Sequence, residues 1–266
     1  KHDFKKKSIK EFSFDEFVEN SKYFIKFINK KHLIAHHGGG NIGNQWLDEE
    51  KFHRRLIQEF PENPQIIFPQ TIYFTNDEIG HSEFENSKCI YNKHRNLSVV
   101  ARESVSYATA KELFYNSKVS LTPDIVLSTN KETFGGTDCK RNGIMLCFRN
   151  DCEKSIANSD FEALTDYLTK NSFDYSITDM HTNKAVTKFN RDEIVKDKIQ
   201  EFLGSRLVIT DRLHGMIFAA ITETPCIALS NYNHKVIGTY NWISYLPYIR
   251  FSNSIDDAIM FAQESE

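Results

Sequence analysis

Short apolar runs alternate with stretches of helical periodicity along the chain. In the first half, apolar residues recur every three or four positions from Phe14 to Ile28, which predicts a helix. Ser13, with Glu16 three residues later, has the pattern of a capping box at the start of that helix. The further elements expected in this half are strands at 33–35, 66–68, 97–101 and 119–121, and helices at 48–60 and 104–114.

The second half repeats this alternation after a polar, glycine-containing link at 128–142. Gly204 is expected to cap the end of one of its helices. The pattern predicts strands at 143–148, 175–178, 206–210, 225–229 and 248–251, and helices at 160–168, 192–203, 213–221, 234–242 and 255–263.

Strands that alternate with helices indicate parallel sheets covered by helices on both faces. The sequence therefore predicts an α/β fold of two Rossmann-like lobes, residues 1–128 and 129–266, joined by the polar link. In such sheets, ligands bind beyond the carboxyl ends of the strands. Residues that directly follow a predicted strand are therefore the first candidates for a functional site.

Composition indicates a globular protein and limits its ligands. Of the 266 residues, 40% are hydrophobic and 26% are charged, which supplies enough apolar material for a core and is not typical of disorder. The net charge of -3 argues against a general nucleic-acid binder, because such proteins usually carry a basic excess. An anionic substrate would therefore need a local basic pocket.

The five cysteines, an odd number without a Cys-x-x-Cys pair, fit a reducing compartment and argue against structural zinc. Cys147 and Cys226 lie in apolar runs and are expected to be buried thiols. No segment approaches the ~20 apolar residues of a membrane helix, and no signal peptide is visible. The expected location is the cytoplasm, with at most peripheral contact with the inner face of the cell membrane. The chain starts at Lys1 rather than Met, so the question whether the natural protein has a segment before Lys1 stays open.

The segment 207–216 carries the strongest candidate chemistry. An apolar strand ends there and a helix begins, with Thr210 or Asp211 as its candidate cap. The first N–H groups of a helix and its positive dipole end favour a bound anion. Arg212 offers a planar fork for a carboxylate or phosphate, and His214 can carry a proton near neutral pH. The alternative is a plain helix start with a surface arginine and a packed histidine.

Consecutive glycines after the strand at 33–35 predict a loop that permits close approach of a ligand to the backbone. We expect Gly39, Gly40 and Asn41 to line the substrate. The spacing is not Gly-x-Gly-x-x-Gly, and no Gly-Lys-Ser/Thr follows. Neither a dinucleotide fingerprint nor a P-loop is therefore supported.

The adjacent histidines His36 and His37 raise the question of a metal site. No acidic or cysteine partner lies at ligand spacing from them, so no metal is predicted. Neighbouring residues on a strand point to opposite faces. The alternative is therefore that one histidine faces the core and the other faces the loop.

Further basic residues also follow predicted strands. Arg102 and Arg149 end strands at equivalent places in the two lobes, which suggests anion binding, although Glu103 could neutralise Arg102. His234 and Lys235 follow the strand at 225–229, and the lysine could supply a point charge to a phosphate. The alternative for this last segment is a polar surface loop.

These motifs, taken in order, resemble the polysaccharide pyruvyl transferase family. The family's glycine loop often continues Gly-Asp, whereas this chain has Gly43-Asn44, and many members begin with an additional strand and loop. The Asp-Arg-Leu-His-Gly string is the most specific of the matches. The matching stretches are HGGGNIG from His37, ARESVS from Ala101, PDIVL from Pro123, VITDRLHGMIFAAITETPCIAL from Val208, and HKVIG from His234.

The resemblance implies a fold like that of GT-B glycosyltransferases, with the active site in a cleft between two lobes. It also implies transfer of a pyruvyl group from phosphoenolpyruvate to a sugar during exopolysaccharide biosynthesis, with closure of a pyruvate ketal and without metal or cofactor. Arg212, His214 and Arg149 match residues that the family places at the donor. The expected acceptor is a lipid-linked oligosaccharide. Its sugar, the bridged hydroxyls, the ketal stereochemistry and the oligomeric state stay open.

For this chemistry we expect His214 as the acid–base catalyst and Arg212 as its partner at the donor. Arg149, Lys235, His234 and Arg102 are expected to bind substrate. Two alternatives stay open. One is a GT-B-type glycosyltransferase that uses a nucleotide sugar. The other is a non-catalytic sugar-binding module, in which some of the 21 Phe and 11 Tyr would stack on sugars.

Overall fold

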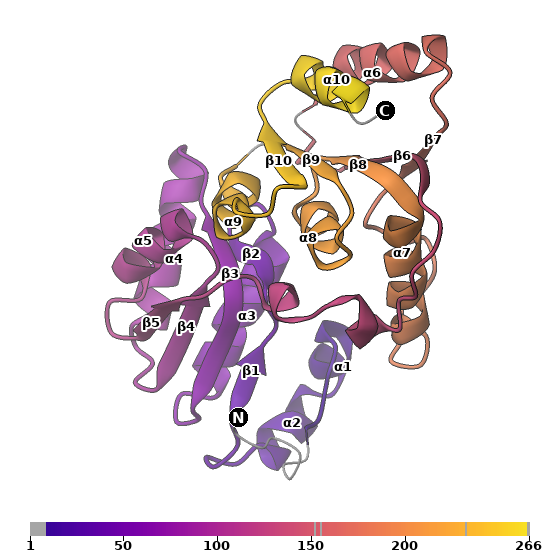
Figure 1. Cartoon of the computed structure of the whole chain (residues 1–266). Helices are drawn as coiled ribbons and strands as arrows, with labels where there is room; N and C mark the ends of the chain where they lie inside the picture. The colour runs from indigo at the N-terminus through magenta and orange to yellow at the C-terminus, as the bar shows by residue number, and fades with distance from the viewer. Residues whose placement is uncertain (1–8, 152, 155, 232, 265–266) are drawn as a thin grey trace. The chain divides into compact units, whose positions relative to one another are not determined.

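The computed structural model describes residues 9–151, 153–154, 156–231 and 233–264, and it divides into two compact units (Figure 1). The first unit comprises the chain up to Val100 together with Ala108–Ser120. The second comprises Ala101–Tyr107 and the chain from Leu121 onward. The division thus falls before the predicted boundary at 128/129, and the short segment Ala101–Tyr107 packs with the second unit.

The first unit is built on a sheet of strand order β1-β3-β4-β5, in which β1 and β2 both pair in parallel with β3. Its core consists of apolar side chains from these strands and from the helices that cover them, such as Ile67, Val99 and Phe114. The elements are α1 (Phe14–Glu19), α2 (Ser21–Phe27), β1 (Ile34–His36), β2 (Gly39–Gly43), α3 (Leu47–Glu59), β3 (Gln65–Tyr73), α4 (Glu78–Tyr91), β4 (Leu97–Ala101), α5 (Ser104–Leu113) and β5 (Lys118–Leu121).

The predicted N-terminal helix is two helices, α1 and α2, which meet at Asn20. The capping box at Ser13 and Glu16 is confirmed, with both hydrogen bonds present. The break has a local cause, because the Asn20 side-chain amide donates to the Glu16 carbonyl and competes with the helical backbone for it.

The prediction of a glycine loop at 38–40 is wrong, because Gly39–Gly43 forms strand β2 beside β3. Gly39 and Gly43 have φ values of 151° and 141°, which only glycine adopts readily. A Cβ at Gly43 would collide with the carbonyl oxygen of Tyr73 on β3. The glycines therefore serve a close approach between two strands.

Of the adjacent histidines one is buried and the other exposed, as the alternative to a metal site predicted, although both rings lie beside the His53 ring, with centroids 5.1 and 5.5 Å away. His36 is 3% exposed, whereas His37 is exposed. The Nε2–H of His36 donates to Gln65 Oε1 at 2.7 Å, and its Nδ1 lies 2.8 Å from Nδ1 of His53. Burial lowers the pKa of His36 to about 4 and that of His53 well below its ordinary value, so both rings are neutral at pH 7.

Helix α4 was absent from the sequence predictions. It is capped by the Asp77 side chain, which accepts from the Gly80 N–H at 2.7 Å. Its buried residues are Gly80, Ser87 and Tyr91, so the buried face carries little apolar periodicity. The hydroxyls of Ser87 and Tyr91 instead donate to the buried Glu50 carboxylate of α3. Tyr91 also packs in the apolar core against Phe114, with Phe84 and Ile90 beside it, but the polar residues among them leave only a weak hydrophobic signal in the sequence.

The second unit has a sheet of order β10-β9-β8-β6-β7, and all four pairs of neighbouring strands in it are parallel. The predicted strands and helices of this half are all present, with ends shifted by a few residues at most, and α7 runs through Gly204 to a cap at Ser205. The elements are η2 (Ile125–Ser128), η3 (Lys131–Phe134), β6 (Asn142–Cys147), α6 (Asn158–Lys170), β7 (Tyr175–Thr178), α7 (Arg191–Gly204), β8 (Ser205–Thr210), α8 (Leu213–Ile221), β9 (Cys226–Leu229), α9 (Lys235–Ile243), β10 (Ile249–Ser252) and α10 (Ile255–Glu264).

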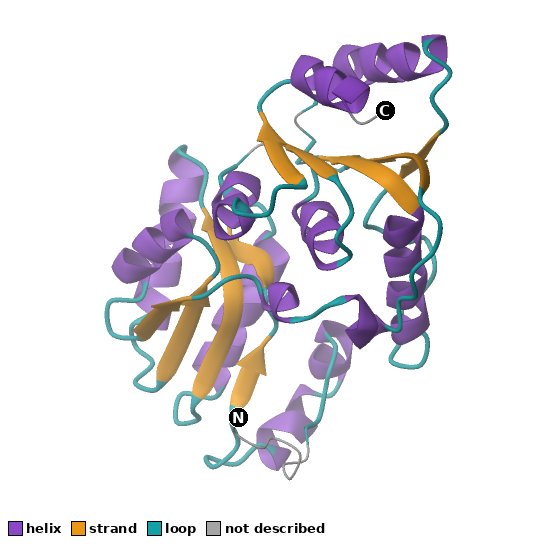
Figure 2. Ribbon diagram, in the orientation of Figure 1, coloured by secondary structure: helices purple, strands orange, loops and turns teal. Residues whose placement is uncertain are grey.

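Helices cover both faces of this second sheet (Figure 2). Val208 and Met145 face α7 and α8, while Ile209 and Leu146 face α6 and α10. This two-sided burial explains the continuous apolar run of β8. It also buries Cys147 and Cys226, as predicted. The α/β class with two parallel-sheet units is therefore confirmed, while a GT-B arrangement with a cleft between them stays a prediction.

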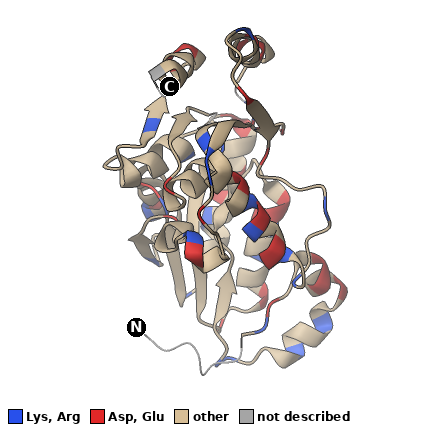
Figure 3. Ribbon diagram, turned by 45° about the vertical axis from the view of Figure 1, so that its right-hand side comes forward, with Lys and Arg blue, Asp and Glu red and all other residues tan. Residues whose placement is uncertain are grey.

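Charged residues of both signs are interspersed along the helices (Figure 3). None of the helices in the described part of the chain is long and apolar enough to cross a membrane. Within the same residues, no group of three or more His, Cys, Asp or Glu side chains could hold a metal ion.

Candidate active site

The turn between β8 and α8 is fixed by its own side chains. Helix α8 begins at Leu213 with Arg212 at the N-cap position, so neither Thr210 nor Asp211 caps it as predicted. The Thr210 hydroxyl instead donates to the Cys147 carbonyl at 2.7 Å and accepts from the Arg212 N–H at 3.0 Å. The first contact ties the turn to the end of β6 and the second fixes the Arg212 backbone, and together they place the Arg212 side chain over the carboxyl edge of the sheet.

Asp211 makes a second tie to the same strand end. Its Oδ1 accepts from the backbone N–H of Arg149 at 2.9 Å. Burial raises the pKa of Asp211 to about 6, although the hydrogen bond and nearby guanidinium groups oppose that rise. The carboxyl ends of β6 and β8 are therefore locked together, and each carries an arginine.

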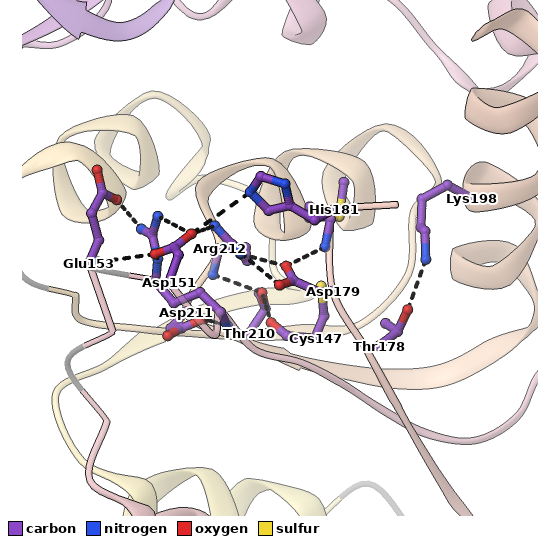
Figure 4. Close-up of polar contacts among 12 residues, drawn as sticks. Cys147, Asp151, Glu153, Thr178, Asp179, His181, Lys198, Thr210, Asp211 and Arg212 are labelled. Atoms are coloured by element: carbon purple, nitrogen blue, oxygen red, sulfur yellow. Dashed lines mark hydrogen bonds and ion pairs between the residues drawn. The ribbon is translucent and has the colours of Figure 1, made fainter. Parts of the chain in front are cut away.

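Arg212 is 7% exposed and its guanidinium is held by two carboxylates (Figure 4). Its Nε and Nη2 donate to the two oxygens of Asp179, both at 2.7 Å, and Nη1 donates to Asp151 at 2.8 Å. Asp179 follows β7 and Asp151 follows β6; β6 lies beside β8 in the sheet, and β7 lies on the far side of β6. This fork geometry fixes the plane of the guanidinium.

Two further cations join the same network. Arg149 donates from Nε and Nη2 to Asp151 at 2.9 and 3.1 Å, and its Nη1 pairs with Glu153. Glu153 also pairs with the Lys235 ammonium at the start of α9. Desolvation lowers the pKa of Lys235 to about 8 against the pull of Glu153. The structure thus brings Arg149, Arg212 and Lys235 together around shared carboxylates.

His214 lies on the first turn of α8, beside a second buried ion pair. Its Nε2 is 3.8 Å from Asp124 Oδ2, and Asp124 accepts from Arg102 Nη1 at 2.9 Å. Desolvation lowers the pKa of His214 to about 4, with Asp124 opposing this and Arg102, Lys235 and Arg212 adding to it. His214 is therefore a neutral imidazole at neutral pH, and 43% of its side chain remains exposed.

The other predicted residues fall into two groups. His234 belongs to the second unit, where its imidazole contacts the side chains of Glu103 and Ser106. Gly39, Gly40 and Asn41 lie in β2 of the first unit, where the Asn41 N–H donates to the Gln70 side chain at 3.1 Å. The structure thus collects Arg102, Arg149, Arg212, His214, His234 and Lys235 in one unit.

Sequence reasoning missed the carboxylates of this site. Asp151 and Asp179 each follow a predicted strand closely, so the strand-end rule contained the signal for them. Asp124 lies in the Pro123-Asp124 string, where it accepts from the Val126 N–H at 3.0 Å and opens η2.

Gly215 gives a direct test of how the turn positions Arg212. A Cβ at residue 215 would collide with the Thr210 hydroxyl, which holds the Arg212 N–H and the Cys147 carbonyl. Gly215→Ala should therefore lower the free energy of unfolding by about 1–3 kcal/mol. It should also weaken anion binding at the cation cluster, which consists of Arg149, Arg212 and Lys235. Urea unfolding and anion-induced thermal shifts measure the two effects. Gly204→Ala, at the end of α7 with only Cys139 near its Cβ, is the matched control, and equal behaviour of the two variants would contradict the role of the turn.

Comparison with known proteins identifies the family of this chain. The model of the family described as polysaccharide pyruvyl transferase matches residues 2–234. General stress protein 30 of Bacillus subtilis (strain 168) is 32% identical over 251 residues, which are 93% of this chain and 71% of that protein. Pyruvyl transferase 1 of Schizosaccharomyces pombe is 29% identical over 219 residues, 78% of this chain and 53% of that protein.

A solved structure shares the fold. The crystal structure of a functionally uncharacterised protein from Klebsiella pneumoniae subsp. pneumoniae NTUH-K2044 superposes with a TM-score of 0.59 at 20% sequence identity, and covers 85% of this chain and 77% of that one. The family match extends over most of the sequence and includes the β8–α8 turn with Arg212 and His214. The chain therefore belongs to the polysaccharide pyruvyl transferase family.

Proposed function

We propose that this protein transfers the pyruvyl group of phosphoenolpyruvate to a sugar of a surface or extracellular polysaccharide precursor and closes a pyruvate ketal. The observation that carries the proposal is the convergence of Arg149, Arg212 and Lys235 at the carboxyl edge of one sheet, next to His214. Phosphoenolpyruvate presents a carboxylate and a phosphate on a small carbon frame. Its binding therefore calls for several cations held close together.

Carboxylates already present at the site would compete with such a donor. Arg149, Arg212 and Lys235 are already paired with the carboxylates Asp151 and Glu153, and Arg212 also with Asp179. A charge-assisted hydrogen bond contributes about 1.5–3 kcal/mol. A donor anion has to compete with these carboxylates for the same N–H groups, so its net gain is smaller than the sum of its new bonds.

This competition predicts the effect of removing one carboxylate. Asp151 bridges Arg149 and Arg212 and is partly exposed. Asp151→Asn keeps a similar shape and removes the negative charge, so we expect phosphoenolpyruvate to bind about 10-fold more tightly, at about 1.4 kcal/mol for each factor of ten. The variant should also unfold at lower urea concentration, since two guanidinium groups lose a shared partner. Titration of the donor by calorimetry measures the affinity. Weaker binding would show that Asp151 chiefly orients the arginines.

In the proposed reaction, a proton goes to the methylene carbon of the donor and a sugar hydroxyl attacks the adjacent carbon. His214 is the proposed acid–base group because its half-exposed imidazole lies beside the cation cluster. The arginines stabilise the charge on the leaving phosphate. Attack by a second hydroxyl with loss of phosphate closes the ketal. The proposal includes no metal or cofactor.

Mass spectrometry of lipid-linked oligosaccharides incubated with the protein and phosphoenolpyruvate tests the function. A gain of one pyruvyl unit in an acceptor, in the presence of EDTA, is the expected result. Phosphoenolpyruvate should also raise the melting temperature, because a ligand of the folded state stabilises it. Stabilisation by nucleoside diphosphates alone, with transfer of a sugar, would favour a nucleotide-sugar glycosyltransferase instead.

A further inference from the structure

The segment Ala101–Tyr107 holds a second histidine of the site through a buried carboxylate. This segment follows β4 but packs with the second unit. The Trp242 Nε1–H of α9 donates to the Arg102 carbonyl at 2.9 Å. Gly238 of α9 leaves room for Glu103, since a Cβ there would come within 2.7 Å of the Glu103 Cβ. The segment is therefore fitted closely against α9.

Glu103 is fully buried and is held in its ionised form. Its oxygens accept from the backbone N–H groups of Val105 at 2.8 Å and Ser106 at 2.9 Å, at the start of α5. Burial raises the pKa of Glu103, but the hydrogen bonds from His234 and Ser106 outweigh it, and the net pKa lies below its ordinary value. A buried carboxylate of this kind favours a cation beside it.

The His234 side chain lies beside the Glu103 carboxylate. Its Nε2 lies 3.2 Å from Glu103 Oε1 and 3.3 Å from the Ser106 hydroxyl, and 19% of its side chain is exposed. The residue directly precedes Lys235, whose ammonium pairs with Glu153 of the cation cluster. Its partner Glu103 is also close to Arg102, whose pKa it raises together with Asp124, the carboxylate beside His214, against the lowering by burial.

The two histidines have opposite electrostatic surroundings. His214 lies 3.8 Å from Asp124, a carboxylate already shared with Arg102. The positive charges of Arg102, Lys235 and Arg212 further disfavour a proton on His214. His234 instead has a closer carboxylate, at 3.2 Å, whose other hydrogen bonds come from neutral groups. The two histidines thus differ in the carboxylate that each one meets.

Ketal formation from phosphoenolpyruvate requires groups that give and take protons in each of two steps. In the first step the donor methylene carbon gains a proton, the carbon–carbon double bond breaks, a bond forms between the adjacent carbon and the first sugar oxygen, and that hydroxyl loses its proton. In the second step the second hydroxyl attacks the same carbon and loses its proton. The bond to phosphate breaks with both electrons on the leaving oxygen, which takes up a proton to give hydrogen phosphate.

We propose that His234, paired with the buried carboxylate of Glu103, is the second catalytic residue and gives the methylene proton, while neutral His214 takes the proton of the first hydroxyl. After this step the two protonation states are exchanged. His234 then accepts the proton of the second hydroxyl, and His214 passes its proton to the leaving phosphate. Both histidines return to their starting states without any other proton carrier. Glu103 acts through His234 and is a positioning residue. The inference rests on the proposed function.

The test compares His234→Gln with Glu103→Gln, and His81→Gln of α4 is the control. With saturating phosphoenolpyruvate and acceptor, His234→Gln should lower kcat by about 10²–10⁴-fold while the donor still raises the melting temperature. Glu103→Gln should keep His234 but move the descending limb of the kcat–pH profile about one unit or more to lower pH, because a nearby carboxylate favours the charged form of a base. Because the donor is saturating, a change in its affinity through the neighbouring Lys235 does not affect kcat. His81→Gln should match the unaltered protein.

Failure of this inference can be told apart from failure of the proposed function. If the unaltered protein transfers no pyruvyl group and phosphoenolpyruvate does not stabilise it, the proposed function is wrong. If it transfers the group and His234→Gln keeps kcat within about threefold, His234 is not a proton carrier. If His234→Gln does not fold, the Glu103→Gln profile decides, and an unmoved descending limb overturns the pairing.

Discussion

Replacing His214 with alanine should lower kcat for pyruvyl transfer by about 10²–10⁴-fold, the usual contribution of a positioned acid–base group. Donor binding should survive, because the phosphate and carboxylate contacts assigned to Arg149, Arg212 and Lys235 remain. The variant also loses no positive charge that could hold the donor, since the lowered pKa of His214 leaves its ring neutral at neutral pH. Phosphate release in the presence of acceptor measures kcat.

The fold should tolerate this change, which makes the result interpretable. The His214 side chain is 43% exposed and its ion-pair distance to Asp124 is 3.8 Å, so its removal leaves no large cavity and no close hydrogen bond unmade. His81→Ala, an exposed histidine of the first unit, serves as the control and should keep full turnover. Unchanged turnover in His214→Ala would remove this residue from the mechanism.

Arg212→Lys should raise KM for phosphoenolpyruvate by about 10–150-fold, which corresponds to the loss of about 1.5–3 kcal/mol of charge-assisted hydrogen bonding. Lysine keeps the charge but cannot reproduce the planar fork that makes two bonds of 2.7 Å to Asp179 and one of 2.8 Å to Asp151. The remaining carboxylates would lose part of their pairing, so the free energy of unfolding should also fall. Steady-state kinetics and urea unfolding separate the two effects.

The matched control for Arg212→Lys lies on the same strand. Arg206 is near the opposite end of β8, where its guanidinium stacks over the Phe173 ring at 5.8 Å. Arg206→Lys should change KM by less than about twofold, since this end of the sheet is far along the strand from the cation cluster. Equal loss of donor affinity in both variants would show that Arg212 acts through general stability rather than through its fork.

The sequence by itself determined most of the second unit. A sheet buried on both faces requires continuous apolar runs, and these runs led to strands predicted at 206–210 and 225–229, close to the observed β8 and β9. The predicted helix at 213–221 coincides with α8. The strand-end rule then led to Arg149, Arg212 and Lys235, because carboxyl ends of parallel strands meet at one edge.

The first unit departed from prediction where packing relies little on apolar side chains. Helix α4 buries Gly80, Ser87 and Tyr91, two of which donate to Glu50, so the apolar period that Phe84, Ile90 and Tyr91 form is incomplete. Gly39–Gly43 forms a strand through the absence of side chains, whereas consecutive glycines ordinarily indicate a loop. Local propensity gave way at both places to contacts with distant parts of the chain.

Sequence alone thus determined the α/β class and the basic residues of the site, since hydrophobic periodicity and strand ends are local features. Only the tertiary structure decided which carboxylate each cation meets. Asp179, Asp151 and Arg212 come from three separate strand ends, and they converge because β7, β6 and β8 are neighbours in the sheet. The same holds for Glu103 and His234, which are brought together by a segment that packs away from its own strand. Strand order and such packing depend on contacts between distant residues, and no local pattern encodes them.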